Sequence, residues 1–269
     1  MLRPRLALHT WSLDTTPLAQ VLRVASETGW DAVELRRLDF RRAVEAGGRP
    51  EDVLHLVLAS ALPVAAVGVE FGWMFADGEE RRRLLGVFGE SCRWAAALGC
   101  STVMSPVDKG RGDVGRAVDS VREVADIAVK HGRRLALEFN SQADQINTLE
   151  QCREIVARAD HPGCGLLLDT YHLQRSGADA RAVSGLSSSE IAYVQYSDVP
   201  AHGLVAGMTL DRLVPGAGTV DFPAIWAALA ATGYTGYMSY EAPNATAWAR
   251  PAGEVAREAL VATRAIESA

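Results

Sequence analysis

The sequence predicts an α/β fold built as one (β/α)8 barrel that spans residues 1–269. Short apolar runs alternate with longer amphipathic segments from end to end, which is the pattern of repeated β-α units around a parallel sheet. A chain of 269 residues with 48% hydrophobic content is long enough to bury such a core. No Pro-rich, Ser-rich or low-complexity linker divides the chain, so a single domain of eight units is expected.

Eight strand and helix pairs follow one another in order. The strands are expected at 5–9, 31–35, 63–70, 101–105, 134–140, 164–169, 191–197 and 236–241. The helices are expected at about 17–28, 51–61, 79–98, 113–131, 148–159, 179–186, 221–231 and 251–267. Four glycines each follow a helical pattern, as expected of left-handed C-terminal caps: Gly29, Gly99, Gly132 and Gly233. Thr148 and Gln151 form the pattern of a capping box at the start of the fifth helix.

An open, doubly wound sheet is the alternative architecture. Such a sheet normally carries a glycine-rich phosphate turn after its first strand, whereas this chain has LALHTWSL at 6–13. Closure into a barrel is therefore favoured. The stretch 198–220 is expected to be a loop, and it is too long to be a mere connector.

Composition and charge argue against several classes of protein. The net charge of −6 and the thin spread of basic residues disfavour nucleic-acid binding. The spacing of the four cysteines fits neither a zinc knuckle nor a disulfide framework, so reduced, buried thiols are expected. No stretch resembles a signal peptide or approaches the ~18 apolar residues of a membrane span, so we expect a soluble, cytoplasmic protein.

Polar residues end four consecutive strands of the predicted barrel. They are Glu138, Asp169, Gln195 and Glu241. Side chains alternate across a strand, so these four can face the barrel axis while the large apolar residues between them face the helices. In barrels of this kind, the active site lies at the carboxyl ends of the strands. The sequence therefore places a functional site at these strand ends.

Three converging carboxylates would repel one another unless a cation joins them. A divalent metal held by Glu138, Asp169 and Glu241, with the neutral amide oxygen of Gln195, resolves the repulsion. An all-oxygen set suits Mn²⁺ or Mg²⁺ better than Zn²⁺. The alternative is that each carboxylate is a separate helix cap or surface ion pair, but the matching positions on consecutive strands favour the metal site.

Several sequence blocks carry a resemblance to a known family: GWDAVEL, LALEFN, LLLDTYH, VQYSD, DRLVPGAGTVDF and GYTGYMSYE. In these blocks, and over nearly its whole length, the chain resembles the xylose-isomerase-like barrels. That superfamily of sugar isomerases and epimerases also includes inosose isomerases and dehydratases, hydroxypyruvate isomerase and endonuclease IV. Gln195 replaces the family's usual histidine and resembles the hydroxypyruvate isomerase branch, whereas the last two blocks resemble the inosose isomerase branch.

The resemblance implies one divalent metal ion held by Glu138, Asp169, Gln195 and Glu241, with Mn²⁺ or Mg²⁺ expected and Co²⁺ or Zn²⁺ as alternatives. It also implies that Glu138 and Glu241 flank the substrate carbon that loses and regains a proton. In such a site the metal would polarise a ketose carbonyl and stabilise the enediolate as it forms. One glutamate would remove the proton and the other would return it.

Five further residues are candidates for binding the substrate: His172, Arg212, His9, Trp11 and Asn140. Each also has a plainer interpretation, such as a solvated loop histidine, a surface arginine, a core histidine or an aromatic loop anchor. Glu34 ends the second strand and either orients another polar group or pairs with Arg36 or Lys109. Asp198 is expected to accept hydrogen bonds beside the site or to cap the segment that follows it.

The function predicted from these residues is a metal-dependent isomerase or epimerase of a ketose, keto-acid or inosose. A dehydratase that acts on a keto-sugar or inosose is the main alternative, because β-elimination begins with the same proton abstraction. An endonuclease IV-like repair enzyme is disfavoured because the chain has only six histidines and no broad basic face. A non-catalytic sugar-binding barrel is disfavoured because all three carboxylates are present. The expected partner is a small carbohydrate, with no nucleic acid or membrane, and the chain could form a homodimer or homotetramer.

Overall fold

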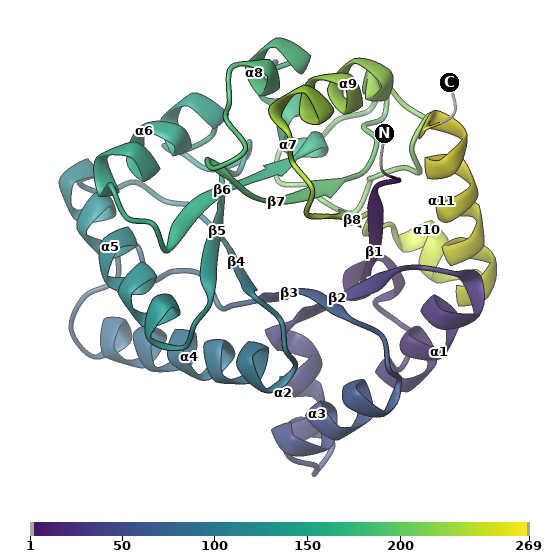
Figure 1. The fold of residues 1–269 in the computed structure, drawn as a ribbon, viewed down its shortest axis with the longest axis horizontal. Coiled ribbons are helices and arrows are strands. Elements are labelled where there is room, and N and C mark those ends of the chain that lie inside the picture. Colours follow the sequence, from purple (N-terminus) through teal and green to yellow (C-terminus); the bar gives the residue numbers. More distant parts are fainter. Residues whose placement is uncertain (1–2, 268–269) are drawn as a thin grey trace.

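The computed structural model describes residues 3–267 and contains a closed barrel of eight parallel strands in sequence order (Figure 1). The strands are β1 (Arg5–His9), β2 (Ala32–Arg36), β3 (Val64–Gly68), β4 (Thr102–Pro106), β5 (Arg134–Glu138), β6 (Cys164–Asp169), β7 (Ile191–Tyr196) and β8 (Tyr237–Tyr240). Each strand pairs with the next, and β1 pairs with β8 to close the ring. The predicted barrel is confirmed, and the open sheet is excluded.

Helices surround the ring of strands on the outside (Figure 1). They are α1 (Leu18–Thr28), α2 (Arg37–Glu45), α3 (Pro50–Ala59), α4 (Gly78–Ala97), α5 (Val114–Lys130), α6 (Leu149–Ala159), α7 (Thr170–Arg175), α8 (Ala180–Ser184), α9 (Phe222–Thr232), α10 (Ala245–Trp248) and α11 (Ala252–Glu267). A 3-10 turn, η1 (Thr10–Leu13), follows β1. The sequence prediction missed η1, α2, α7 and α10. All four follow the carboxyl ends of strands, and they are too short or too rich in charge to show a clear apolar period.

The predicted helix caps agree with the backbone conformation. Gly29 and Gly233 end α1 and α9 with φ angles of 91° and 81°. The Thr148 hydroxyl accepts a hydrogen bond from the Gln151 N–H at 3.3 Å, and the Gln151 side chain accepts one from the Thr148 N–H at 3.2 Å. The capping box therefore opens α6 as expected.

Two buried clusters show which way the strand residues point. The small inner cluster lies on the barrel axis and contains mostly alanines, with Leu167 and Tyr193. Leu135, Leu168 and Val194, which alternate with inner residues, belong to the outer cluster between strands and helices. The alternation inferred from the sequence is thus confirmed, and it places the polar strand ends on the inner side.

Both ends of the described chain lie at the side of the barrel where β1 begins. The Arg264 guanidinium, in the last turn of α11, donates a hydrogen bond to the Pro4 carbonyl at 3.3 Å. At the other side, the predicted loop 198–220 has no helix, and Asp198 and Leu213 form an isolated antiparallel bridge within it. Within residues 3–267, no helix is long and apolar enough to cross a membrane.

Candidate active site

A pocket of about 370 Å³ opens at the carboxyl ends of the strands. Its lining includes seven of the candidate site residues, contributed by five strands and the segments that follow them. They are His9, Trp11, Glu138, Asn140, His172, Arg212 and Glu241. Except for Trp11 and Asn140, these side chains are almost fully buried. Buried ionisable groups therefore line the pocket.

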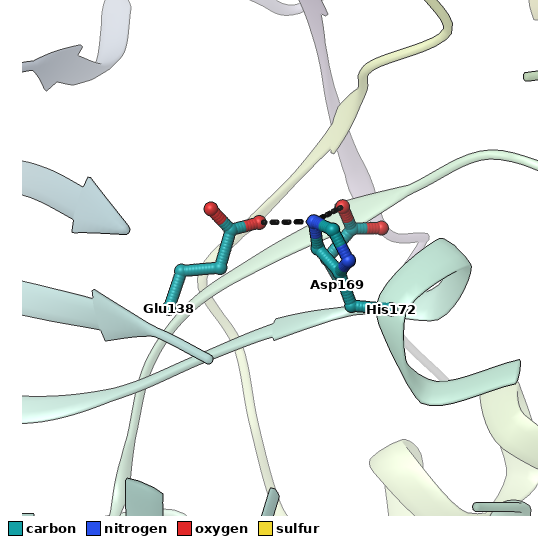
Figure 2. A group of neighbouring side chains, drawn as sticks. All are labelled: Glu138, Asp169 and His172. Carbon is teal, nitrogen blue, oxygen red and sulfur yellow. Dashed lines mark ion pairs between the residues drawn. The ribbon is translucent and has the colours of Figure 1, made fainter. Parts of the chain in front are cut away.

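Glu138, Asp169 and His172 form one cluster, with Glu138 at the end of β5, Asp169 at the end of β6 and His172 on α7 (Figure 2). Their candidate ligand atoms all lie within 4.8 Å of one another, so this group could hold a metal ion. The His172 Nε2 atom is 3.8 Å from Glu138 Oε1 and 3.9 Å from Asp169 Oδ2. The sequence predicted the two carboxylates as ligands but assigned His172 to the substrate.

Both ring nitrogens of His172 lie beside polar groups. The Ser141 backbone N–H donates to Nδ1 at 3.3 Å, and the Ser141 hydroxyl, which can donate or accept, lies 2.9 Å from the same atom. On the other side of the ring, Arg212 Nη2, which can only donate, lies 3.5 Å from Nε2. Burial lowers the pKa of His172 to about 4, so the ring is neutral and carries one lone pair and one N–H. His172 can therefore serve either as a metal ligand or as a substrate-binding residue.

Arg212 joins two of the predicted ligand carboxylates. Its Nη1 atom donates to Asp169 Oδ2 at 2.7 Å and to Glu241 Oε2 at 2.8 Å. The guanidinium also stacks on the Tyr171 ring, with its central carbon 4.3 Å from the ring centroid. Only 3% of Arg212 is exposed, so the interpretation of this residue as a surface arginine is wrong.

The two glutamates of the cluster are difficult to ionise without a compensating cation. Burial raises the pKa of Glu138 well above its usual range, and the Glu241 and Asp169 carboxylates raise it further. Burial also raises the pKa of Glu241 to about 7, against the lowering effect of Arg212. One guanidinium is thus not enough to offset the desolvation of these carboxyls.

Gln195 lies on β7 directly opposite Asp169 in the strand register and is fully buried. Its Nε2 atom donates to Glu34 Oε1 at 2.9 Å, whereas its Oε1 atom is buried without a hydrogen-bond partner among residues 3–267. Glu138 Oε1 is likewise buried without a hydrogen-bond partner in this part of the chain. Buried lone pairs without donors are costly, and a divalent cation would satisfy them. The oxygen atoms of this site therefore fit a hard metal ion.

The other predicted binding residues have local partners. His9 accepts a hydrogen bond from the Trp11 N–H at Nδ1, and its Nε2 atom is 3.3 Å from Glu241 Oε1. The side-chain Oδ1 atom of Asn140 accepts a hydrogen bond from the Gln142 backbone N–H at 2.9 Å. His9 therefore lies beside a candidate catalytic glutamate, whereas Asn140 shapes the loop after β5.

Some features of the site had no clear signal in the sequence. Arg36, Arg37 and Arg41, from β2 and α2, line the pocket with Lys109. Arg36 and Arg37 are neutralised by ion pairs of 2.6 Å, to Asp14 and Glu90 respectively, but none of the ion pairs within residues 3–267 involves Lys109. The repeated arginines in LRRLDFRR were the one available signal for this basic wall.

The sequence of the chain is similar to those of known proteins. The family model described as a xylose isomerase-like TIM barrel matches residues 22–266. The chain belongs to this family. Its members among the curated relatives include inosose isomerases, sugar epimerases and 3-dehydroshikimate dehydratases, so the resemblance found in the sequence is confirmed at the level of the family.

Two relatives with different activities and one solved structure illustrate the similarity. The 3-dehydroshikimate dehydratase of Pseudomonas aeruginosa is 28% identical over 88% of this chain, which spans only 38% of that relative. The 3-dehydro-D-guloside 4-epimerase of Escherichia coli is 28% identical, with 83% of this chain and 86% of the relative covered. The crystal structure of the IOLI protein, which holds a zinc atom, superposes with a TM-score of 0.88 at 22% identity and covers 98% of each chain.

Proposed function

We propose that this barrel removes a proton next to the carbonyl of a small polyhydroxylated ketone, such as a ketose or an inosose, and returns it to give an isomer or epimer. The observation that carries the proposal is the cluster of three buried carboxylates: Glu138 and Glu241 line one pocket, and Arg212 joins Asp169 to Glu241. A carbon acid beside a carbonyl needs a positioned, desolvated base, and two of these carboxylates can serve as base and acid. The curated isomerases and epimerases of the family support this chemistry.

We further propose that Glu138, Asp169, Gln195 and Glu241 hold one divalent metal ion, Mn²⁺ or Mg²⁺. The unpartnered oxygens of Glu138 and Gln195 support this set, and the zinc atom in the related IOLI structure supports the presence of a divalent ion. When bound, such an ion supplies positive charge that makes the proton beside a carbonyl easier to remove. Oxygen ligands favour hard ions over zinc.

The remaining residues would orient the substrate. His172 lines the pocket as a neutral imidazole, and Arg212 offers a charged donor beside Asp169 and Glu241. Glu138 would remove the proton from the substrate carbon, and Glu241 would return it. Because both carboxylates are buried, water competes poorly for the proton while the substrate is bound.

A dehydratase is the second candidate function. Its support is the Pseudomonas aeruginosa relative together with the basic wall, where Lys109 could pair with a carboxylate on the substrate. Elimination starts with the same proton abstraction by Glu138 but then expels a hydroxyl group. The two candidates therefore differ in the product and not in the first step.

The test is a screen of ketoses, inososes and carboxylated keto-cyclitols in deuterated buffer with added Mn²⁺, followed by NMR. Exchange at the carbon beside the carbonyl without loss of water supports the isomerase or epimerase, whereas loss of water identifies the dehydratase. Glu138→Gln should lower the exchange rate at least ~100-fold. Glu70→Gln is the matched control, because Glu70 lines the same pocket outside the carboxylate cluster. Equal exchange by both variants would refute the assignment of the base.

A further inference from the structure

Glu34 is a buried carboxylate that the proposed proton transfer does not use. It lies in β2 and is fully buried. Its Oε1 atom accepts the hydrogen bond from Gln195 Nε2 at 2.9 Å, and its Oε2 atom accepts one from the Tyr193 hydroxyl at 3.1 Å. Burying a carboxylate is costly, so a carboxylate in the barrel interior needs hydrogen-bond donors around it. The side chains of Gln195 and Tyr193 are these donors.

The contact between Glu34 and Gln195 decides which way the carboxamide faces. The two ends of a carboxamide have nearly the same shape, so packing alone cannot distinguish its oxygen from its nitrogen. The Oε1 atom of Glu34 is placed as an acceptor, so it selects the NH₂ end. Burial raises the pKa of Glu34 to about 8, but a proton taken up on Oε2 would face the Tyr193 hydroxyl, which can also accept, and would leave Oε1 as the acceptor for Gln195. The oxygen of Gln195 must then face the other side, where it has no partner within residues 3–267.

Glu34 is itself held in place, so it can impose this orientation. Its second oxygen is bound by Tyr193, two residues before Gln195 on the same strand. The His9 Nε2 atom lies 3.5 Å from Glu34 Oε1 and 3.3 Å from Glu241 Oε1. Contacts from β1 and β7 therefore fix the carboxylate from two directions.

We infer that Glu34 is a positioning residue that turns the Gln195 carboxamide so that its oxygen faces the metal site. The inference rests on the metal set in the proposed function and goes beyond it, because Glu34 itself binds neither metal nor substrate. The same geometry explains how a neutral ligand can be used at position 195. A side chain with a donor on one side and a lone pair on the other is held by Glu34 and binds a cation at the same time.

A purely structural network would stabilise the barrel without affecting the affinity for a metal, so the test measures that affinity directly. The full chain is stripped of metal, and binding of Mn²⁺ is measured by calorimetry. We expect Glu34→Leu, which removes both acceptors at similar volume, to weaken binding ~10- to 100-fold. Glu34→Gln keeps an amide oxygen as acceptor and should weaken binding less. In a Gln195→Ala background, Glu34→Leu should change the affinity less than ~2-fold, because the residue through which it acts is gone.

The orientation of the carboxamide can also be observed without any metal. In protein labelled with ¹⁵N-glutamine, the side-chain signals of Gln195 are assigned by their loss in Gln195→Ala. The hydrogen bond to Glu34 shifts these amide protons downfield and slows their exchange with solvent. We expect the signals to move upfield and exchange faster in Glu34→Ala, which offers no side-chain acceptor. This measurement serves even if Glu34→Leu does not fold.

The outcomes separate this inference from the proposed function. If the wild type and Glu34→Leu bind Mn²⁺ equally while Gln195→Ala binds it weakly, the inference is overturned and the metal site stands. If Glu34→Leu loses as much affinity in the Gln195→Ala background as in the wild type, Glu34 does not act through Gln195. If the wild type binds no Mn²⁺, the inference is overturned together with the proposed metal.

Discussion

Asp198 should stabilise the loop that carries Arg212 more than any neighbouring carboxylate. Its Oδ1 atom accepts from the N–H groups of Val199 and Val220, at 2.8 and 2.9 Å, and its Oδ2 atom accepts from those of Gly216 and Gly218, at 2.9 and 2.8 Å. The residue is fully buried. Its backbone also pairs with Leu213, next to Arg212, so the loop depends on this single residue.

The expected cost of Asp198→Asn follows from these contacts. The amide oxygen of asparagine can replace one carboxylate oxygen, but its NH₂ group faces two backbone N–H groups that need an acceptor. Two hydrogen bonds to a charged group are therefore lost, at ~1.5–3 kcal/mol each. We expect the free energy of unfolding to fall by ~3–6 kcal/mol.

Asp221→Asn provides a matched control at the end of the same loop. Asp221 caps α9 with one bond to the Ala224 N–H at 3.1 Å, and asparagine caps a helix about as well as aspartate. Denaturant unfolding followed by circular dichroism should separate the two variants by at least ~3 kcal/mol. Hydrogen exchange at Gly216 and Gly218 should accelerate only in Asp198→Asn. A difference below ~1 kcal/mol with unchanged exchange would refute the reasoning.

Three further outcomes are expected. Gln195→His should raise the affinity for Zn²⁺ relative to Mn²⁺ by ~10-fold in calorimetric titrations, because imidazole is a softer ligand than an amide oxygen; an unchanged ratio would contradict its role as a ligand. The four buried cysteines should not react with a thiol reagent at pH 8 in the native protein, but all four should react in guanidinium. The reason is that burial raises the pKa of their thiols, to about 12 for Cys92, Cys100 and Cys164. Gly218→Ala should lower the melting temperature, because its Cβ would lie 2.2 Å from the Val199 carbonyl oxygen. The control Gly86→Ala, in an open helical position, should raise the free energy of unfolding by ~1 kcal/mol. Similar melting temperatures of the two variants would argue against the close approach at Gly218.

Much of the fold could be predicted from the sequence because its repeated units are long and regular. The apolar strands and the amphipathic helices each carry their own period, and Gly29 and Gly233 mark helix ends by a conformation that other residues rarely adopt. The pointing direction of Glu138 and Asp169 followed from alternation along a strand. These local rules do not depend on contacts between distant residues.

The details of the site could not be predicted, because they depend on contacts across the barrel. Glu34 and Gln195 are separated by 161 positions in the chain, and only closure of the barrel brings them to 2.9 Å. The sequence left open whether Glu34 orients a polar group or pairs with Arg36 or Lys109. Within residues 3–267, its side chain is hydrogen-bonded to Gln195 and Tyr193, and no ion pair joins it to either of the two cations. The contacts of His172 likewise involve Ser141, which lies 31 positions away in the chain and follows another strand.

The proximity of Pro4 and Arg264 has a practical consequence for engineering. A tag, a reporter or a second catalytic module joined to either end of the chain would emerge where β1 begins, on the far side of the barrel from the pocket. Two such attachments would start close together, which suits energy-transfer pairs as sensors of barrel opening. A short peptide could join the two ends, with new ends placed in an exposed loop between helices. The resulting circular permutant should keep the pocket at the carboxyl ends of the strands unchanged.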